Sequence, residues 1–149
     1  GMPGIQAGGV VDERAFFDWI DGVLRIAHER DLTDHAASNL GTWLSECPAE
    51  PEGDWPCIVV RQLLENPSNE RIRNGFIIGV LNNRGVHSRA IDAGGNQERT
   101  LAQQFRDGAN RLLAAFPRTA ETLEDIARSY DRDARWHDND AALWREGTR

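Results

Sequence analysis

An apolar stripe near the C-terminus constrains the fold of this chain more than any other sequence feature. Seven residues recur in alternating steps of four and three: Leu123, Ala127, Tyr130, Ala134, His137, Ala141 and Trp144. Such steps place side chains on one face of a helix, so we expect one continuous helix of about 22 residues, roughly 33 Å long. Charged residues occupy the opposite face. A domain that contains this helix must be built mainly from helices packed along it.

Further helices are predicted wherever apolar residues repeat at helical spacing. The predicted segments are residues 12–30, 33–47, 54–65, 66–83, 96–116 and 119 onward. The β-branched residues 58–60 could form a strand instead, but the helical pattern continues through residue 65 and no partner strand is evident. The expected fold class is all-α, an irregular bundle of five or six helices with a long C-terminal helix. We expect the fourth and last helices at its centre.

Capping and glycine signals refine these helices. We expect Asp54 to cap the third helix, with Pro56 in its first turn. Gly41 lies inside the second helix and is expected to mark a close helix contact, since glycine otherwise weakens a helix. Gly75 and Gly79 lie four residues apart, so they are expected to present a flat surface to another helix.

The domain organisation follows from composition. Residues 1–10 are small and glycine-rich, so we expect a disordered tail, in which Gly1 before Met2 resembles a residue left by tag removal. Residues 11–149 are expected to form a single helical domain. The chain shows no signal peptide and no run approaching the roughly 18 apolar residues of a membrane span. We therefore expect a cytoplasmic location and no membrane partner.

The basic residues are all arginine and are unevenly distributed. The chain has 17 basic and 24 acidic residues, which give a formal net charge of −7. This balance argues against a nucleic-acid partner. Residues 71–91, however, contain four arginines and no acidic residue. A small anionic ligand is therefore expected to bind here, if the chain binds one at all.

This arginine-rich region supplies the candidate site. It is followed by two glycines at the start of the fifth helix, where free N–H groups and guanidinium groups would both attract phosphate or carboxylate. The preferred acid–base group is the histidine of this region. The candidate ligand-binding residues are Arg71, Asn74, Arg84, His87, Arg89 and Arg99. Alternatively, the arginines pair with the acidic first and last helices and only orient the connecting loop, which is the simpler interpretation.

The remaining histidines and the cysteines form no recognised catalytic or metal-binding signature. Asp133, His137 and Asp140 have a spacing compatible with a metal, but a solvated helix face explains them more simply. Cys47 and Cys57 could form a bridge, although two reduced thiols are expected in the cytoplasm. We therefore predict no catalytic residue, no metal and no cofactor.

Three stretches, residues 82–89, 94–99 and 130–138, resemble helical segments of uncharacterised proteins from GC-rich bacteria. Arginine without lysine, together with abundant alanine, glycine and aspartate, fits the coding bias of such genomes. The resemblance covers about the C-terminal half of the chain. It implies an all-helical protein and no particular activity.

The leading functional hypothesis is a non-enzymatic helical interaction or regulatory module, because no catalytic signature is present. We expect a homo-oligomer, most simply a homodimer, or another protein partner, in contact with the alanine-rich stripe that ends at Trp144. Trp136 would extend that contact patch. The alternative is a small anionic-ligand binder or enzyme that uses residues 71–99.

Overall fold

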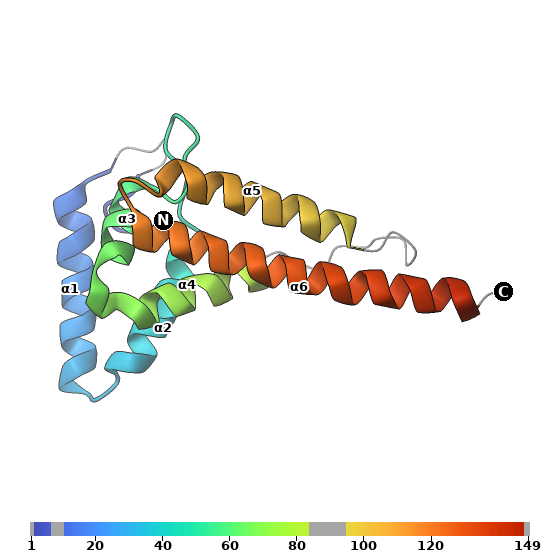
Figure 1. The fold of residues 1–149 in the computed structure, drawn as a ribbon. Coiled ribbons are helices and arrows are strands. Elements are labelled where there is room, and N and C mark those ends of the chain that lie inside the picture. Colours follow the sequence, from blue (N-terminus) through green and yellow to red (C-terminus); the bar gives the residue numbers. More distant parts are fainter. Residues whose placement is uncertain (1, 7–10, 84–94, 148–149) are drawn as a thin grey trace.

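The structure is a computed structural model that describes residues 2–6, 11–83 and 95–147 (Figure 1). Six α-helices and no strand occur in these ranges, so the predicted all-α class is confirmed. Residues 58–60, the alternative strand, belong to the third helix. A short 3-10 turn, Pro67–Asn69, precedes α4. The helices are α1 (Glu13–Glu29), α2 (Thr33–Leu44), α3 (Ile58–Glu65), α4 (Glu70–Asn83), α5 (Asn96–Leu112) and α6 (Pro117–Gly147).

Helices α2 and α4 pack closely because glycines stand where side chains would collide. A Cβ added to Gly41 of α2 would overlap the Ile72 carbonyl oxygen of α4. In the same way, a Cβ added to Gly75 of α4 would overlap the Ser38 carbonyl oxygen, and Gly79 fits tightly against the end of α2. Both expectations about these glycines are confirmed. The pair forms one of two tightly packed units in the fold.

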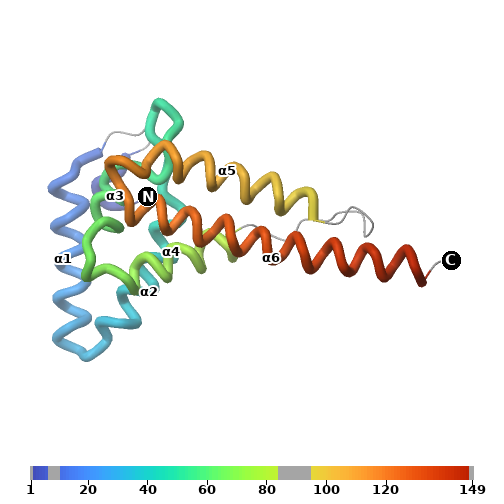
Figure 2. Tube along the Cα trace, viewed as in Figure 1, coloured from blue at the N-terminus to red at the C-terminus, as the bar shows by residue number. Residues whose placement is uncertain are grey.

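Helices α5 and α6 form the second unit, an antiparallel hairpin that turns at Pro117 (Figure 1). Across it, Arg106 of α5 forms an ion pair with Asp131 of α6 and lies 3.9 Å from Glu124. Helix α6 has 31 residues and is therefore about 46 Å long. Figure 2 shows that α6 continues well past the start of α5, so its last turns project from the bundle. None of the described helices combines the length and apolarity that crossing a bilayer requires.

The core lies where these two units meet α1 and α3. Helix α6 buries residues along most of its length, as expected for a central helix. Helix α4 buries Ile72 and Phe76 but leaves Ile78 half exposed, so only one side of α4 faces the core. The largest fully buried apolar side chains are Phe16, Ile20, Leu44, Leu64, Ile72, Phe76, Leu123 and Ile126.

Part of the segment expected to be a disordered tail belongs to the folded domain. Ile5 is buried in the hydrophobic core, and the Asp12 N–H donates to the Gly4 carbonyl oxygen at 2.6 Å. Residues 2–6 therefore cover the start of α1, because Ile5 is apolar enough to favour burial despite its small neighbours. Residues 1 and 7–10 of the predicted tail lie outside the described residues.

The predicted cap of the third helix is wrong by three residues. Helix α3 begins at Ile58, and Cys57 rather than Asp54 occupies the capping position. The Asp54 carboxylate instead pairs with Arg111 of α5 at 3.0 Å, and its carbonyl oxygen accepts from Glu50 N–H. An ion pair between residues distant in the sequence thus holds Asp54 in the loop, whereas the local capping pattern predicts Asp54 at the start of a helix.

Candidate functional site

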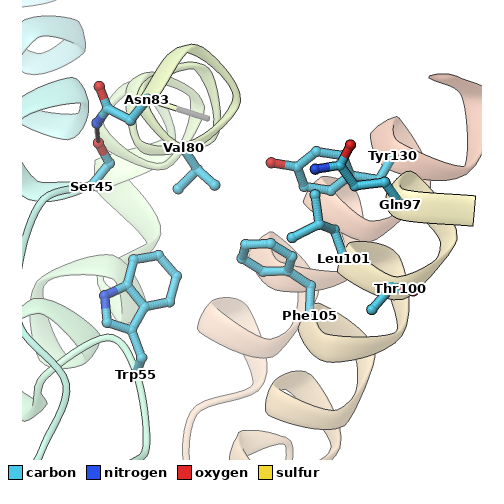
Figure 3. A pocket seen from close by; sticks show the side chains of 9 residues that line it. All are labelled: Ser45, Trp55, Val80, Asn83, Gln97, Thr100, Leu101, Phe105 and Tyr130. Carbon is cyan, nitrogen blue, oxygen red and sulfur yellow. Dashed lines mark hydrogen bonds between the residues drawn. The ribbon is translucent and has the colours of Figure 1, made fainter. Parts of the chain in front are cut away.

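A cleft of about 620 Å³ lies between the α2–α4 pair and the α5–α6 hairpin (Figure 3). One wall comes from the end of α2, the following loop and α4, and the other from α5 and α6. Clefts of this size between helices are typical places for small-molecule ligands. Its lining residues are Ser45, Trp55, Val80, Asn83, Gln97, Thr100, Leu101, Phe105 and Tyr130.

Aromatic rings from three different elements meet in this cleft. The Phe105 and Tyr130 rings are stacked, with centroids 5.7 Å apart, and the Trp55 ring meets Phe105 edge-on at 6.2 Å. Behind Trp55, the buried Phe76 ring of α4 stacks at 5.2 Å. The rings therefore form a continuous series that joins α4 to α6. Flat apolar surfaces of this kind favour a ligand that contains a planar ring.

Trp55 is held in place although it lies in a loop. Its indole Nε1 donates a hydrogen bond of 2.9 Å to the Cys47 carbonyl oxygen. Stacking on Phe76 holds one face of the indole. Because the nitrogen is already paired, Trp55 presents its ring rather than a hydrogen-bond donor to the cleft.

Neutral polar groups lie at the edges of the cleft. The Asn83 amide nitrogen donates to the Ser45 hydroxyl at 3.1 Å, and that hydroxyl donates to the Thr42 carbonyl oxygen at 2.5 Å. Figure 3 shows the Gln97 amide on the opposite wall, above Leu101. Asn83 retains its carbonyl oxygen as an acceptor, so the two amides can recognise polar atoms at the rim of a ligand. None of the nine lining residues described carries a formal charge or titrates near neutral pH.

The arginine candidates that the structure describes lie in two separate places. Arg71 at the start of α4 forms a 3.0 Å ion pair with Asp34 at the start of α2. Asn74 is exposed on the same helix. Figure 1 shows the beginnings of α4 and α5 far apart, so Arg71 and Arg99 do not share a site. The other three candidates, Arg84, His87 and Arg89, lie outside the described residues.

The start of α5 does bind an anion, and the chain supplies it. One carboxylate oxygen of Asp138, in α6, accepts from the Gly95 N–H at 2.8 Å, and the other accepts from Arg99 at 2.5 Å. Arg99 and the Gly95 N–H lower the pKa of this carboxyl below its ordinary value, because both stabilise its charged form. Arg99 thus pairs with the last helix, as the simpler interpretation of the arginines expects.

No group of three or more potential metal ligands occurs among the described residues. His137 instead lies 3.8 Å from the buried carboxylate of Glu98, across the α5–α6 interface. Asp138 is committed to Arg99, and Asp133 and Asp140 are exposed. The solvated-face interpretation of that helix therefore fits Asp133 and Asp140.

A second surface feature lies on the projecting end of α6. Trp136, Leu143 and Trp144 expose 63%, 66% and 54% of their area. A hollow of about 380 Å³ is lined by Asp140, Leu143, Trp144 and Gly147. The alanines of the predicted stripe do not contribute, since Ala127, Ala134 and Ala141 are buried within the chain. The exposed apolar surface of α6 therefore differs from the alanine surface predicted for a dimer contact.

Comparison with family models, curated proteins and solved structures returns no match. The function must therefore be argued from the chain's own residues. The sequence pattern places Tyr130 on the apolar stripe of the last helix, and it identifies neither Trp55 nor Phe105 as a site residue. Nothing in their local spacing indicates a cleft, because its walls come from segments separated by up to 85 positions in the chain.

Proposed function

We propose that this protein is a non-enzymatic binding module, of a regulatory kind, whose cleft holds a small molecule that contains a planar ring. The observation that carries the proposal is the cleft itself, in which Trp55, Phe105 and Tyr130 offer ring faces and Asn83 and Gln97 offer amides. Apolar walls with a few polar groups that fix orientation are the usual composition of ligand sites. None of the described lining residues is charged or titrates near neutral pH, which favours recognition over acid–base chemistry.

The proposal is tested with the neutral fluorescent probe N-phenyl-1-naphthylamine. Its emission should rise on binding to the folded chain. The substitution Leu101→Trp fills the cleft, so it should weaken binding by at least about tenfold, equivalent to about 1.4 kcal/mol. Leu113→Trp is the matched control, because Leu113 is exposed at the end of α5 and does not line the cleft.

Two results would overturn this function. One is that the folded wild-type chain does not bind the probe at all. The other is that the Leu101→Trp variant binds the probe as tightly as the Leu113→Trp variant does. A parallel titration with the anionic relative 1-anilinonaphthalene-8-sulfonate addresses the anionic-ligand alternative. That alternative requires much tighter binding of the anionic probe, together with a strong dependence on salt.

A second candidate function, self-association, is favoured by the exposed Trp136, Leu143 and Trp144. Residues 128–147 contain four arginines and five acidic residues, so each copy of this segment carries a net charge of only −1 and two copies repel each other little. A homodimer should lose affinity on Leu143→Asp, whereas Leu113→Asp should leave it unchanged. Sedimentation equilibrium measures both. A wild-type chain that stays monomeric at high concentration rejects this candidate.

We also propose a cytoplasmic location. Both cysteines are free thiols, which is the ordinary state in a reducing compartment. Fractionation of cells that express the full chain tests this directly.

A further inference from the structure

Cys47 and Cys57 lie together under the loop that separates α2 from α3. They expose only 5% and 2% of their area, and their side chains are in mutual hydrogen-bond contact. Cys57 is also the N-cap of α3, so its sulfur lies at the start of that helix, near the Val60 N–H. The two sulfurs are therefore close enough that modest side-chain rotation could bring them to bonding distance, about 2.05 Å.

The surroundings of the pair distinguish its two members. The Cys47 thiol donates to Cys57, and the Val60 N–H and the Arg61 guanidinium further favour a negative charge on that sulfur. These contacts lower the pKa of Cys57 below its ordinary value, against burial and the nearby Glu50 carboxylate, which raise it. Donation to Cys57 and burial raise the pKa of Cys47. Thiolate character therefore concentrates on Cys57.

Arg61 gives an independent reason to expect an anion here. It is 94% buried, since only 6% of its area is exposed, and its Nη2 has no hydrogen-bond partner among the described residues. Its Nε donates to the Pro56 carbonyl oxygen at 2.6 Å, and its guanidinium carbon lies 5.5 Å from the centre of the Phe116 ring. A buried cation with an unsatisfied donor is costly unless a negative charge lies near it. Ionisation of Cys57 would supply such a charge, since Arg61 acts electrostatically on that sulfur.

We propose that Cys47 and Cys57 form an oxidation site for small hydroperoxides, with Cys57 as the attacking thiol and Cys47 as the resolving thiol. The Cys57 sulfur attacks the peroxide, so an S–O bond forms while the O–O bond breaks, and the other oxygen leaves as water or an alcohol after taking a proton. The Cys47 sulfur then attacks Cys57, so the S–S bond forms and a water leaves. Two thiols are thereby oxidised by two electrons and one hydroperoxide is reduced.

Access and consequence both depend on the loop of residues 48–56. This loop contains no helix, and several of its residues are exposed, so local opening can admit a molecule as small as hydrogen peroxide. Larger oxidants such as glutathione disulfide are excluded by the burial of both sulfurs. Trp55 lies within the loop and hydrogen-bonds the Cys47 carbonyl oxygen, so its fluorescence should report disulfide formation.

The test treats the reduced full chain with hydrogen peroxide after the reductant has been removed, followed by peptide mass spectrometry. The chain has only two cysteines, so an intramolecular disulfide must join Cys47 to Cys57. The variant Cys47→Ser should stop at a Cys57 sulfenic acid, which dimedone captures. In Cys57→Ser, the remaining thiol should react at least about tenfold more slowly than Cys57 does in Cys47→Ser. Circular dichroism verifies that each variant is folded.

Limited labelling of the wild-type chain with iodoacetamide gives a measurement that needs no variant. Modification should appear first at Cys57. The proposal is overturned if Cys47 is labelled first, or if Cys57→Ser reacts with peroxide as fast as Cys47→Ser. It is equally overturned if the folded wild-type chain forms no disulfide under conditions in which the urea-unfolded chain does.

Discussion

Replacing Gly41 with alanine should separate α2 from α4. The new methyl group would collide with the Ile72 carbonyl oxygen, and it would lie 2.6 Å from the Phe76 nitrogen and 2.9 Å from the Gly75 carbonyl carbon. Ordinary contacts of a Cβ begin at 3.4 Å, so the Phe76 nitrogen alone would be 0.8 Å too close. All three atoms belong to the backbone of α4. Relief therefore requires movement of a whole helix rather than rotation of one side chain.

The magnitude follows from two opposing effects. Overpacking of a well-packed interface costs about 1–3 kcal/mol, and a rigid backbone neighbour places this site near the upper value. Alanine stabilises a helix relative to glycine by about 1 kcal/mol. The expected net loss is about 2 kcal/mol in the free energy of unfolding. For a chain of this size, the melting temperature should fall by about 4–8 °C.

Gly22→Ala is the matched control for this prediction. Gly22 lies inside α1, and nothing comes within 4 Å of a Cβ added there. The same substitution should therefore stabilise the protein by about 0.5–1 kcal/mol. Urea unfolding followed by circular dichroism measures both variants. If Gly41→Ala is as stable as Gly22→Ala, the close approach of α2 and α4 is incorrect.

Three further outcomes are expected. The pKa of the Asp138 carboxyl is lowered in the folded state, so this group stabilises the fold above the unfolded pKa near 3.8, and the stabilisation is lost as pH falls through the folded pKa. The difference in urea stability between wild type and Asp138→Asn should therefore shrink on acidification. A difference that stays constant with pH would contradict the pairing with Arg99. Arg106→Gln removes a partly exposed ion pair with Asp131, so unfolding should become easier by about 1 kcal/mol, with a smaller effect in high salt; an equal effect in high salt would argue against the ion pair. Trp55→Phe removes the hydrogen bond to the Cys47 carbonyl oxygen, so it should lower the free energy of unfolding by about 1 kcal/mol and weaken probe binding only modestly. Loss of all probe binding would instead assign the indole nitrogen a direct role in binding.

The helices themselves were predictable because their signals are local. Apolar residues at helical spacing identify α1 and α6, and the position of Gly41 inside a helix correctly indicated a close contact. The start of α3 was not predictable in the same way. Asp54 looks like a cap from its neighbours in the sequence, but its carboxylate pairs with Arg111, 57 residues away.

The candidate site was harder to predict for a related reason. A stretch of sequence with several arginines and no acidic residue indicates an anion site. In the structure, however, Arg71 pairs with Asp34 and Arg99 pairs with Asp138, and both acidic partners are distant in the sequence. The aromatic cleft requires α4 and α6 to be placed relative to one another, and spacing within either helix contains no information about that placement. What a sequence pattern assigns to a buried core can equally be the wall of a cleft.

The length of α6 has a mechanical consequence. Tyr130 contributes its ring to the cleft near the middle of this helix, while Trp144 lies near the projecting end. A helix of about 46 Å behaves as a stiff rod, so a tilt of about 5° at the Pro117 end displaces the far end by about 4 Å. Any rigid tilt of this helix about its Pro117 end would therefore move its exposed tip farther than the residues that pack against α5.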